Sequence, residues 1–380
     1  MTAATTIDPI LISIAAELPR PEFSTEELLT AGRGHLSDAL IGMLNGIGVH
    51  KRHSVLANYP DVLFADAEPE LDIATADLAV LAARKCLAKS DIDPESIGLV
   101  LGISSAPGRL LPSLVCDVIA RMPEIPRTVA NLSIEYMGCS AMAKVVETAR
   151  WYLSCNPGKR VLACFTEAIT PLSPVLPDFY SHFTEIDRAD RQKTVDALHG
   201  FLFADAAVAM VFGAEGDGPS FGPVANLTNE RPEDTELGTV PDGGSDIPVV
   251  HGRRLYTLSA DVTPRGAFYA RETVRMLLAD KATGLTAPVD AATLLMHTGS
   301  TRILDALCEQ FGVDPQAQTV ASSYRVLREY GNTLGCSVPL MVAEPTDRRA
   351  GEGIVVAFGL SFSCGAFTMK VPEGGWNPGV

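Results

Sequence analysis

Basic side chains are scarce in this 380-residue chain: 30 lysines and arginines stand against 46 aspartates and glutamates, giving a formal net charge of −16. A chain with this charge repels both the phosphate backbone of nucleic acids and anionic lipid surfaces. A basic region is also missing from the N-terminus, where Asp8 precedes a short apolar run that is typical of a first β-strand rather than a signal peptide. We therefore expect no nucleic-acid partner, no membrane partner and a cytoplasmic location.

Long apolar runs are absent too. The longest stretch without charge runs from Gly353 to Met369 and is broken by Gly359, Ser361, Ser363 and Gly365. It is shorter than the roughly 18 apolar residues that suggest a membrane span. Two buried strands around a turn explain this stretch better.

Motifs for metals and nucleotides are missing as well. The eight cysteines form no C-x-x-C pair, there is no H-E-x-x-H, and the single H-x-x-H, at His50 and His53, has no cysteine or carboxylate close by. Cysteines scattered through a long cytosolic chain indicate reduced thiols rather than a disulfide framework. Neither a P-loop nor a G-x-G-x-x-G after a strand is present. We expect no metal and no nucleotide cofactor.

What the sequence does contain is an internal repeat. A helical pattern, the strand-like IGLVLGISS and a second helix recur later as ARETVRMLLADK, AATLLMHTGS and TRILDALCEQFGVDP. Residues 132–167 and 326–360 continue alike, each with Gly-Cys-Ser opening an apolar helix, then a polar loop, then an apolar strand. Alternating helices and apolar strands predict sheets covered on both faces. Chance self-similarity among α/β chains is the alternative to true duplication.

We therefore predict a layered α/β fold built from two pseudo-duplicated halves, with mixed, mostly parallel sheets. The first half comprises residues 1–212 and the second comprises residues 213–380.

Cys139 is a candidate nucleophile. It lies between the strand-like VANLSIEYM and the helical AMAKVVETARWYL, so that free N–H groups and the positive end of the helix dipole would favour its thiolate. A buried structural cysteine is the ordinary alternative, and Cys336 has the same local context. His297 ends an apolar strand, and Asn332 occupies a Gly-Asn turn that could equally be a helix cap. A pseudo-twofold axis would bring His297 and Asn332 to Cys139 in one central cleft.

At these residues the sequence resembles the ketoacyl synthase III and type III polyketide synthase (chalcone-synthase-like) branch of the thiolase superfamily. The resemblance covers nearly the whole chain and is carried by NGIGVHKRHSVL, GCSAMAKVVETARWYL, HGFLFADAAVAMVFGAE, MHTGSTRILDALCEQFGV, EYGNTLGCSVPLM and SFSCGAFTMKV. It implies a thiolase-like layered αβαβα fold. It also implies that the first half carries Cys139 and that the second carries His297 and Asn332.

The resemblance implies a condensing reaction. Cys139 would accept an acyl group from a coenzyme A or acyl-carrier-protein thioester, and His297 and Asn332 would bind the thioester oxygen of a malonyl-type extender. Decarboxylative condensation would then give a β-ketoacyl or short polyketide product without any cofactor besides the thioester substrates. One alternative is acyl transfer to an alcohol or amine without a new carbon–carbon bond. Another is a silent subunit of a heterodimeric synthase, which would need none of the three residues.

The resemblance assigns roles to three further residues. Backbone N–H groups of Cys139 and Gly365 would hold the acyl oxyanion. Leu172, beside Pro171 and Pro174, would line the acyl pocket. Leu111 would cross a dimer interface and line the partner's pocket, which implies a homodimer.

The chain also departs from the family pattern. Ser363 and Cys364 stand where glycine or proline is common in the terminal hairpin. The basic positions that bind coenzyme A in plant-type enzymes align with the uncharged Ala39, Gly42 and Gly46, and the weak substitutes are Lys51, Arg52, Arg253 and Arg254. We expect surface or loop roles for the two remaining histidines of interest, His182 and His199.

Overall fold

The computed structural model describes residues 6–173, 197–240, 257–259, 261–297, 299–345, 349–359 and 363–376. Within these residues, one nine-stranded sheet has the order β11-β12-β13-β8-β1-β7-β6-β4-β5. Its strands are β1 (Ile10–Glu17), β4 (Ile97–Ser104), β5 (Ala130–Glu135), β6 (Arg160–Glu167), β7 (Ala206–Gly213), β8 (Ser220–Thr228), β11 (Leu294–Met296), β12 (Gly351–Gly359) and β13 (Ser363–Val371).

Apolar composition explains why the central strands form. β7 reads AAVAMVFG, and all of its residues are buried. Strands of this kind need cover on both faces, because neither face carries polar side chains for water. β1 confirms the predicted N-terminal strand, and β12 pairs antiparallel with β13 from Gly351 to Gly359, which confirms two buried strands in the uncharged stretch.

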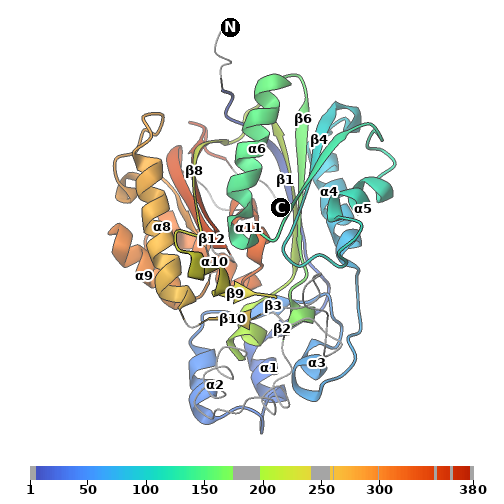
Figure 1. Ribbon diagram of the computed structural model, residues 1–380, viewed down its shortest axis with the longest axis vertical. Coiled ribbons are helices and arrows are strands. Elements are labelled where there is room, and N and C mark those ends of the chain that lie inside the picture. Colours follow the sequence, from blue (N-terminus) through green and yellow to red (C-terminus); the bar gives the residue numbers. More distant parts are fainter. Residues whose placement is uncertain are drawn as a thin grey trace.

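Helices cover the outer sides of two groups of strands and also fill the space between the two groups (Figure 1). Figure 1 shows α6 and α11 between two groups of strands, with α4 and α5 outside one group and α8 and α9 outside the other. This is the layered α/β arrangement that the sequence predicts. The bounds of the helices in these layers are α4 (Thr75–Lys89), α5 (Leu114–Arg121), α6 (Ala141–Cys155), α8 (Val262–Leu278), α9 (Thr301–Phe311), α10 (Ala321–Tyr330) and α11 (Ser337–Ala343).

The sheet is mixed as predicted, but the expectation that it is mostly parallel is wrong. Parallel pairs join β4 to β5, β4 to β6 and β11 to β12. The other five neighbouring pairs run antiparallel. The physical reason is that parallel neighbours need a long crossover connection, whereas β12 ends only four positions before β13 begins, a separation that suits antiparallel pairing.

The order of elements repeats along the chain. α4, β4 and α5 are followed by the 3₁₀ turn η2 (Gly138–Ser140), α6 and β6, while α8, β11 and α9 are followed by η8 (Leu334–Cys336), α11 and β12. The two Gly-Cys-Ser segments therefore take the same local form. We keep the division into residues 1–212 and 213–380 as a proposal, which the placement of β8 and β11 to β13 on one side of the sheet supports.

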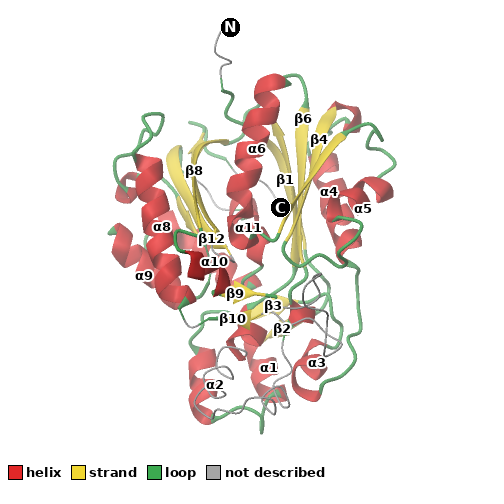
Figure 2. Ribbon diagram, in the orientation of Figure 1, coloured by secondary structure: helices red, strands yellow, loops and turns green. Residues whose placement is uncertain are grey.

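A smaller group of elements lies at the lower end of the molecule in Figures 1 and 2, below the large sheet. It contains β2 (Glu22–Ser24), α1 (Thr25–Ala31), α2 (Asp38–Asn45), β3 (Lys51–His53) and α3 (Tyr59–Ala65), and nearby lies the pair β9 (Gly238–Thr239) and β10 (Thr257–Leu258). A reciprocal capping box between Ser24 and Glu27 starts α1. None of the described helices combines the length and apolar character needed to cross a membrane.

Candidate active site

Cys139 sits at the start of the long inner helix, as predicted. It is the middle residue of η2, directly before α6, and its side chain is 3% exposed. Gly138 has a φ of +54°, a left-handed conformation that favours glycine and that turns the chain from β5 into the helix. The nucleophile candidate thus lies in the interior, between the two groups of strands.

The thiol of Cys139 is not favoured as a thiolate, which corrects the expectation from the helix terminus. Burial raises its pKa well above the ordinary value, and the neighbouring carboxyl of Glu167 raises it further. Desolvation disfavours the charged form of any thiol, and here it outweighs the backbone hydrogen bond at Cys139, which lowers the pKa. The resting enzyme therefore holds a protonated Cys139.

Asn332 lies beside Cys139. The Cys139 sulfur is 3.9 Å from Asn332 Oδ1, and the same oxygen accepts a hydrogen bond of 3.0 Å from the Leu334 amide. The backbone of Asn332 is fixed as well, since its N–H donates to Leu202 and its carbonyl accepts from Ala204. With Oδ1 held as an acceptor, the amide nitrogen of Asn332 is left as the donor end of the side chain.

His297 follows β11 and is buried, 3% exposed. Burial lowers its pKa to about 3, so the imidazole is neutral at ordinary pH. Nδ1 is buried and has no hydrogen-bond partner among the described residues, and the ring packs on Phe358 with centroids 4.7 Å apart. A neutral imidazole can donate one hydrogen bond without bringing a charge into the core.

The end of β12 links His297 to Cys139. Phe358 packs on the His297 ring, and the next residue, Gly359, lies so close to η2 that an added Cβ would be 3.1 Å from the Cys139 amide nitrogen. The same Cβ would clash with the carbonyl of Met137, which explains why this position needs glycine. Cys139 and Asn332 thus lie side by side, and His297 is linked to the Cys139 turn through Phe358 and Gly359. The convergence of all three in one active site stays a prediction.

Similarity to known proteins falls on the same residues. Residues 282–371, which include His297 and Asn332, match the family described as 3-oxoacyl-[acyl-carrier-protein (ACP)] synthase III C terminal. The chain is 28% identical over 303 residues to the β-ketoacyl-[acyl-carrier-protein] synthase III of Nitratidesulfovibrio vulgaris, covering 77% of this chain and 81% of that protein.

Solved structures with the same fold cover nearly the whole chain. The C-terminal type III polyketide synthase domain of Steely1 from Dictyostelium has a TM-score of 0.76 at 18% identity, over 96% of this chain and 99% of that one. The 3-oxoacyl-[acyl-carrier-protein] synthase III of Aquifex aeolicus has a TM-score of 0.71 at 17% identity, over 95% and 99%. OleA of Xanthomonas campestris has a TM-score of 0.74 at 17% identity, over 96% and 98%.

The chain is therefore similar to the ketoacyl synthase III and type III polyketide synthase branch of the thiolase superfamily, as its sequence predicts. Its thiolase-like fold is the one predicted from the sequence. The matched C-terminal region, residues 282–371, contains two of the three candidate active-site residues.

The sequence analysis did not identify two buried carboxyls. Glu167, at the end of β6, and Asp205 are fully buried, and burial raises the pKa of Glu167 to about 8 and that of Asp205 to about 6. Asp205 accepts hydrogen bonds from the amides of Val55, Ile169 and Thr170. A lone acidic residue ending an apolar strand, as in VLACFTE, is the signal that could have revealed Glu167.

Gly365 lies close to η2, since a Cβ added to it would be 3.6 Å from the Ser140 carbonyl. It lies within β13, paired with Ala357 and Asn226, and its α-carbon faces Ala143 of α6. The glycine that borders the Cys139 amide is Gly359. A role for Gly365 in holding an acyl oxyanion stays a prediction.

The two pocket leucines differ in exposure. Leu172 lies in the 3₁₀ turn η3 (Thr170–Leu172), half-buried against the core cluster that contains Cys139, and its role in lining the acyl pocket stays a prediction. Leu111 is 84% exposed in the loop between β4 and α5. Pro174 and His182 lie outside the described residues.

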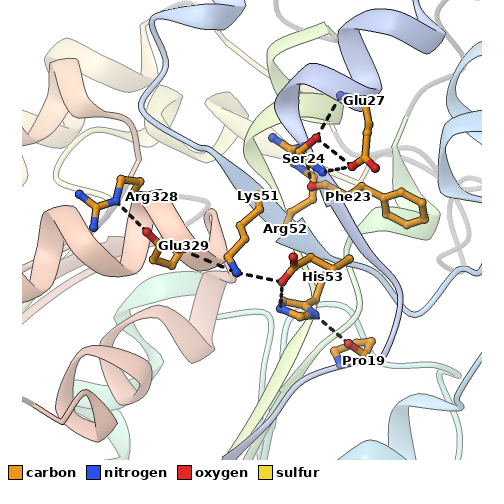
Figure 3. Close-up of polar contacts among 10 residues, drawn as sticks. Pro19, Phe23, Ser24, Glu27, Lys51, Arg52, His53, Arg328 and Glu329 are labelled. Atoms are coloured by element: carbon orange, nitrogen blue, oxygen red, sulfur yellow. Dashed lines mark hydrogen bonds and ion pairs between the residues drawn. The ribbon is translucent and has the colours of Figure 1, made fainter.

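The basic residues considered for coenzyme A are engaged elsewhere or not described. Arg52 is fully buried, donates to the carbonyl of Phe201 and to Thr25, and its burial lowers its pKa to about 10, so the suggestion that it binds a ligand is wrong. Figure 3 shows Lys51 reaching toward Glu329, and it also forms a 3.1 Å ion pair with Glu22. Arg253 and Arg254 lie outside the described residues.

Two smaller expectations concern histidines and metals. His199 is 1% exposed and packs on Phe203 at 4.5 Å, so the surface or loop role expected for it is wrong. In the described part of the chain, no three His, Cys, Asp or Glu side chains gather into a group that could hold a metal. The absence of a metal stays a prediction.

Proposed function

We propose that this protein is an acyl-thioester condensing enzyme that makes a β-ketoacyl or short polyketide product through an acyl-Cys139 intermediate. The observation that carries the proposal is the 3.9 Å approach of the buried Cys139 sulfur to Asn332. Neutral His297, whose ring packs on Phe358 next to Gly359, supports it. The similarity to a β-ketoacyl-[acyl-carrier-protein] synthase III supports it.

The first step is acylation. The Cys139 sulfur attacks the carbonyl carbon of an acyl thioester, the new carbon–sulfur bond forms, and the carrier's sulfur departs as a thiol with the Cys139 proton. Because the resting thiol is protonated, proton removal has to accompany the attack. The short turn η2 offers its backbone N–H groups at the start of α6, where a developing oxyanion is stabilised.

The second step is condensation. A malonyl-type thioester loses carbon dioxide, and the electron pair of the broken bond forms an enolate. Neutral donors from His297 and Asn332 hold the enolate oxygen, and the enolate carbon then attacks the acyl carbonyl, forming a carbon–carbon bond and releasing Cys139. Neutral, pre-oriented donors in a site shielded from water stabilise such an oxyanion strongly, because no solvent has to reorganise.

Partners and assembly belong to the same proposal. We propose that the substrates are coenzyme A or acyl-carrier-protein thioesters, that no further cofactor takes part, and that the protein is cytoplasmic. A homodimer across β5 is supported by the exposed Leu111, Leu132 and Tyr136 and by the position of β5 at the end of the sheet. An exposed edge strand can pair with the same strand of a second copy.

The test is incubation with an acyl thioester and malonyl thioester, followed by mass analysis of protein and products. Acyl mass on Cys139, release of carbon dioxide and a product longer by two carbons would support the proposal. Acyl transfer to an added alcohol or amine, without carbon dioxide release, would favour a simple acyltransferase instead.

A further inference from the structure

Glu167 is a buried carboxyl shared by the two halves of the molecule. Its Oε2 accepts hydrogen bonds of 2.8 Å and 3.0 Å from the amides of Ser105 and Ala106, in the loop after β4. Its Oε1 accepts a 3.1 Å hydrogen bond from the amide of Gly335 in η8. No lysine or arginine of the described residues forms an ion pair with it.

The two Gly-Cys-Ser turns meet at this carboxyl. A Cβ added to Gly335 would lie 2.6 Å from Glu167 Oε1 and 3.4 Å from the Gly138 carbonyl. On the nucleophile side, the Gly138 amide donates a 2.7 Å hydrogen bond to Ser105 Oγ. On the other side, Gly335 follows Leu334, whose amide donates to Asn332 Oδ1.

Hydrogen bonds linked through Ser105 and through the Leu334–Gly335 backbone therefore connect the Cys139 turn to Asn332 by way of Glu167. A carboxyl with two oxygens can accept from three N–H groups that converge from two separate segments. Burying a carboxyl without a cation is costly, so a site that keeps one has to compensate through such bonds.

We infer that Glu167 is a positioning residue that fixes the Cys139 turn against the Asn332 turn and so sets the geometry needed for condensation. The inference rests on the proposed function for its catalytic consequence. The structural part of the inference does not rest on the proposed function, because the hydrogen bonds join the two turns regardless of which acceptor takes the acyl group.

Once it is ionised, above its pKa of about 8, the carboxyl also acts on the thiol through its charge, because it contributes to the raised pKa of Cys139. The titratable groups around Glu167 are Cys139 of η2, Cys336 of η8 and the more distant Asp205. Removing the charge and keeping the shape should therefore lower the pKa of Cys139, whereas a residue that merely filled space would leave it unchanged.

The experiment compares Glu167→Gln with the matched variant Asp205→Asn, which alters a second fully buried carboxyl that accepts backbone N–H bonds. Each variant is checked for folding by circular dichroism, and Cys139 alkylation by iodoacetamide is followed against pH. We expect Glu167→Gln to shift the alkylation profile to lower pH and to slow condensation by up to about 10²-fold, the scale of a misplacement of about 1 Å. Asp205→Asn should leave the alkylation profile in place.

A second variant tests the inference if Glu167→Gln does not fold. Ser105→Ala removes the bond to the Gly138 amide but leaves the carboxyl, so condensation should slow while the alkylation profile stays unchanged. If the wild-type protein becomes acylated but catalyses no condensation, the proposed function fails. The alkylation profiles still test whether Glu167 acts on Cys139. Folded Glu167→Gln with wild-type alkylation, acylation and condensation would overturn the inference.

Discussion

The sulfur of Cys139 lies 3.9 Å from Oδ1 of Asn332, although 193 positions separate the two residues in the chain. The first comes from the turn before α6 and the second from the segment between α10 and η8. Asn332 reaches this place because its backbone bridges to Phe203 on one side and its side chain accepts from Leu334 on the other.

Cys139, and not Cys336, should carry the acyl group. Both thiols are buried, but Cys336 Sγ lies 3.3 Å from the Ala206 carbonyl, whereas Cys139 faces Asn332. Peptide mapping after treatment with an acyl thioester should find acyl mass on Cys139 in wild type and in Cys336→Ala, and none in Cys139→Ala. An active Cys139→Ala protein acylated at Cys336 would end the mechanism.

Alkylation of Cys139 should be slow at neutral pH and should accelerate as the pH rises beyond about 9, the ordinary thiol range. Because the pKa is raised, the reactive thiolate forms only on the alkaline side of that range. Cys116 and Cys155 are exposed and should react first. Peptide-resolved iodoacetamide kinetics would show the order, and Cys139 reacting fastest near neutral pH would restore the thiolate expected from the helix terminus.

Replacement of Asn332 should separate the two chemical steps. In Asn332→Ala, acylation of Cys139 should persist, while decarboxylation of a malonyl thioester should fall by about 10²-fold or more, the usual effect of removing one oxyanion donor. The measurement is a burst of acyl-enzyme by mass spectrometry together with carbon dioxide release. If the variant instead acylates an alcohol or amine at the wild-type rate, and neither protein releases carbon dioxide, the acyltransferase alternative replaces the synthase.

Leu111 should contribute to the homodimer. A leucine that is 84% exposed gains by burial against a second copy, so Leu111→Asp should shift the protein toward monomer and lower activity through the partner's pocket. Leu71, 65% exposed, offers the control Leu71→Asp. Sedimentation velocity at several concentrations measures the assembly, and equal association of both variants and wild type would exclude this interface.

The sequence by itself determined the layered α/β class, the repeat and the three candidate active-site residues. It could do so because buried strands and helices leave periodic apolar patterns, and because Gly-Cys-Ser, His297 and Asn332 each stand at the end of such a pattern. Strand β1 and the paired strands β12 and β13 could also be predicted from the sequence, since their apolar runs are short and bounded by charged residues.

Only the tertiary structure decided how these residues are surrounded. Local sequence indicates a helix terminus at Cys139 but not its degree of burial, so the sign of the thiol pKa shift depends on distant elements that exclude water, Glu167 among them. The sequence suggests that Arg52 and His199 are accessible polar residues. In the fold, Arg52 packs on Phe201 and His199 packs on Phe203, and both are buried. The join at Glu167 exists only once both halves are folded, because its three N–H donors come from segments more than 200 positions apart in the chain, at Ser105, Ala106 and Gly335.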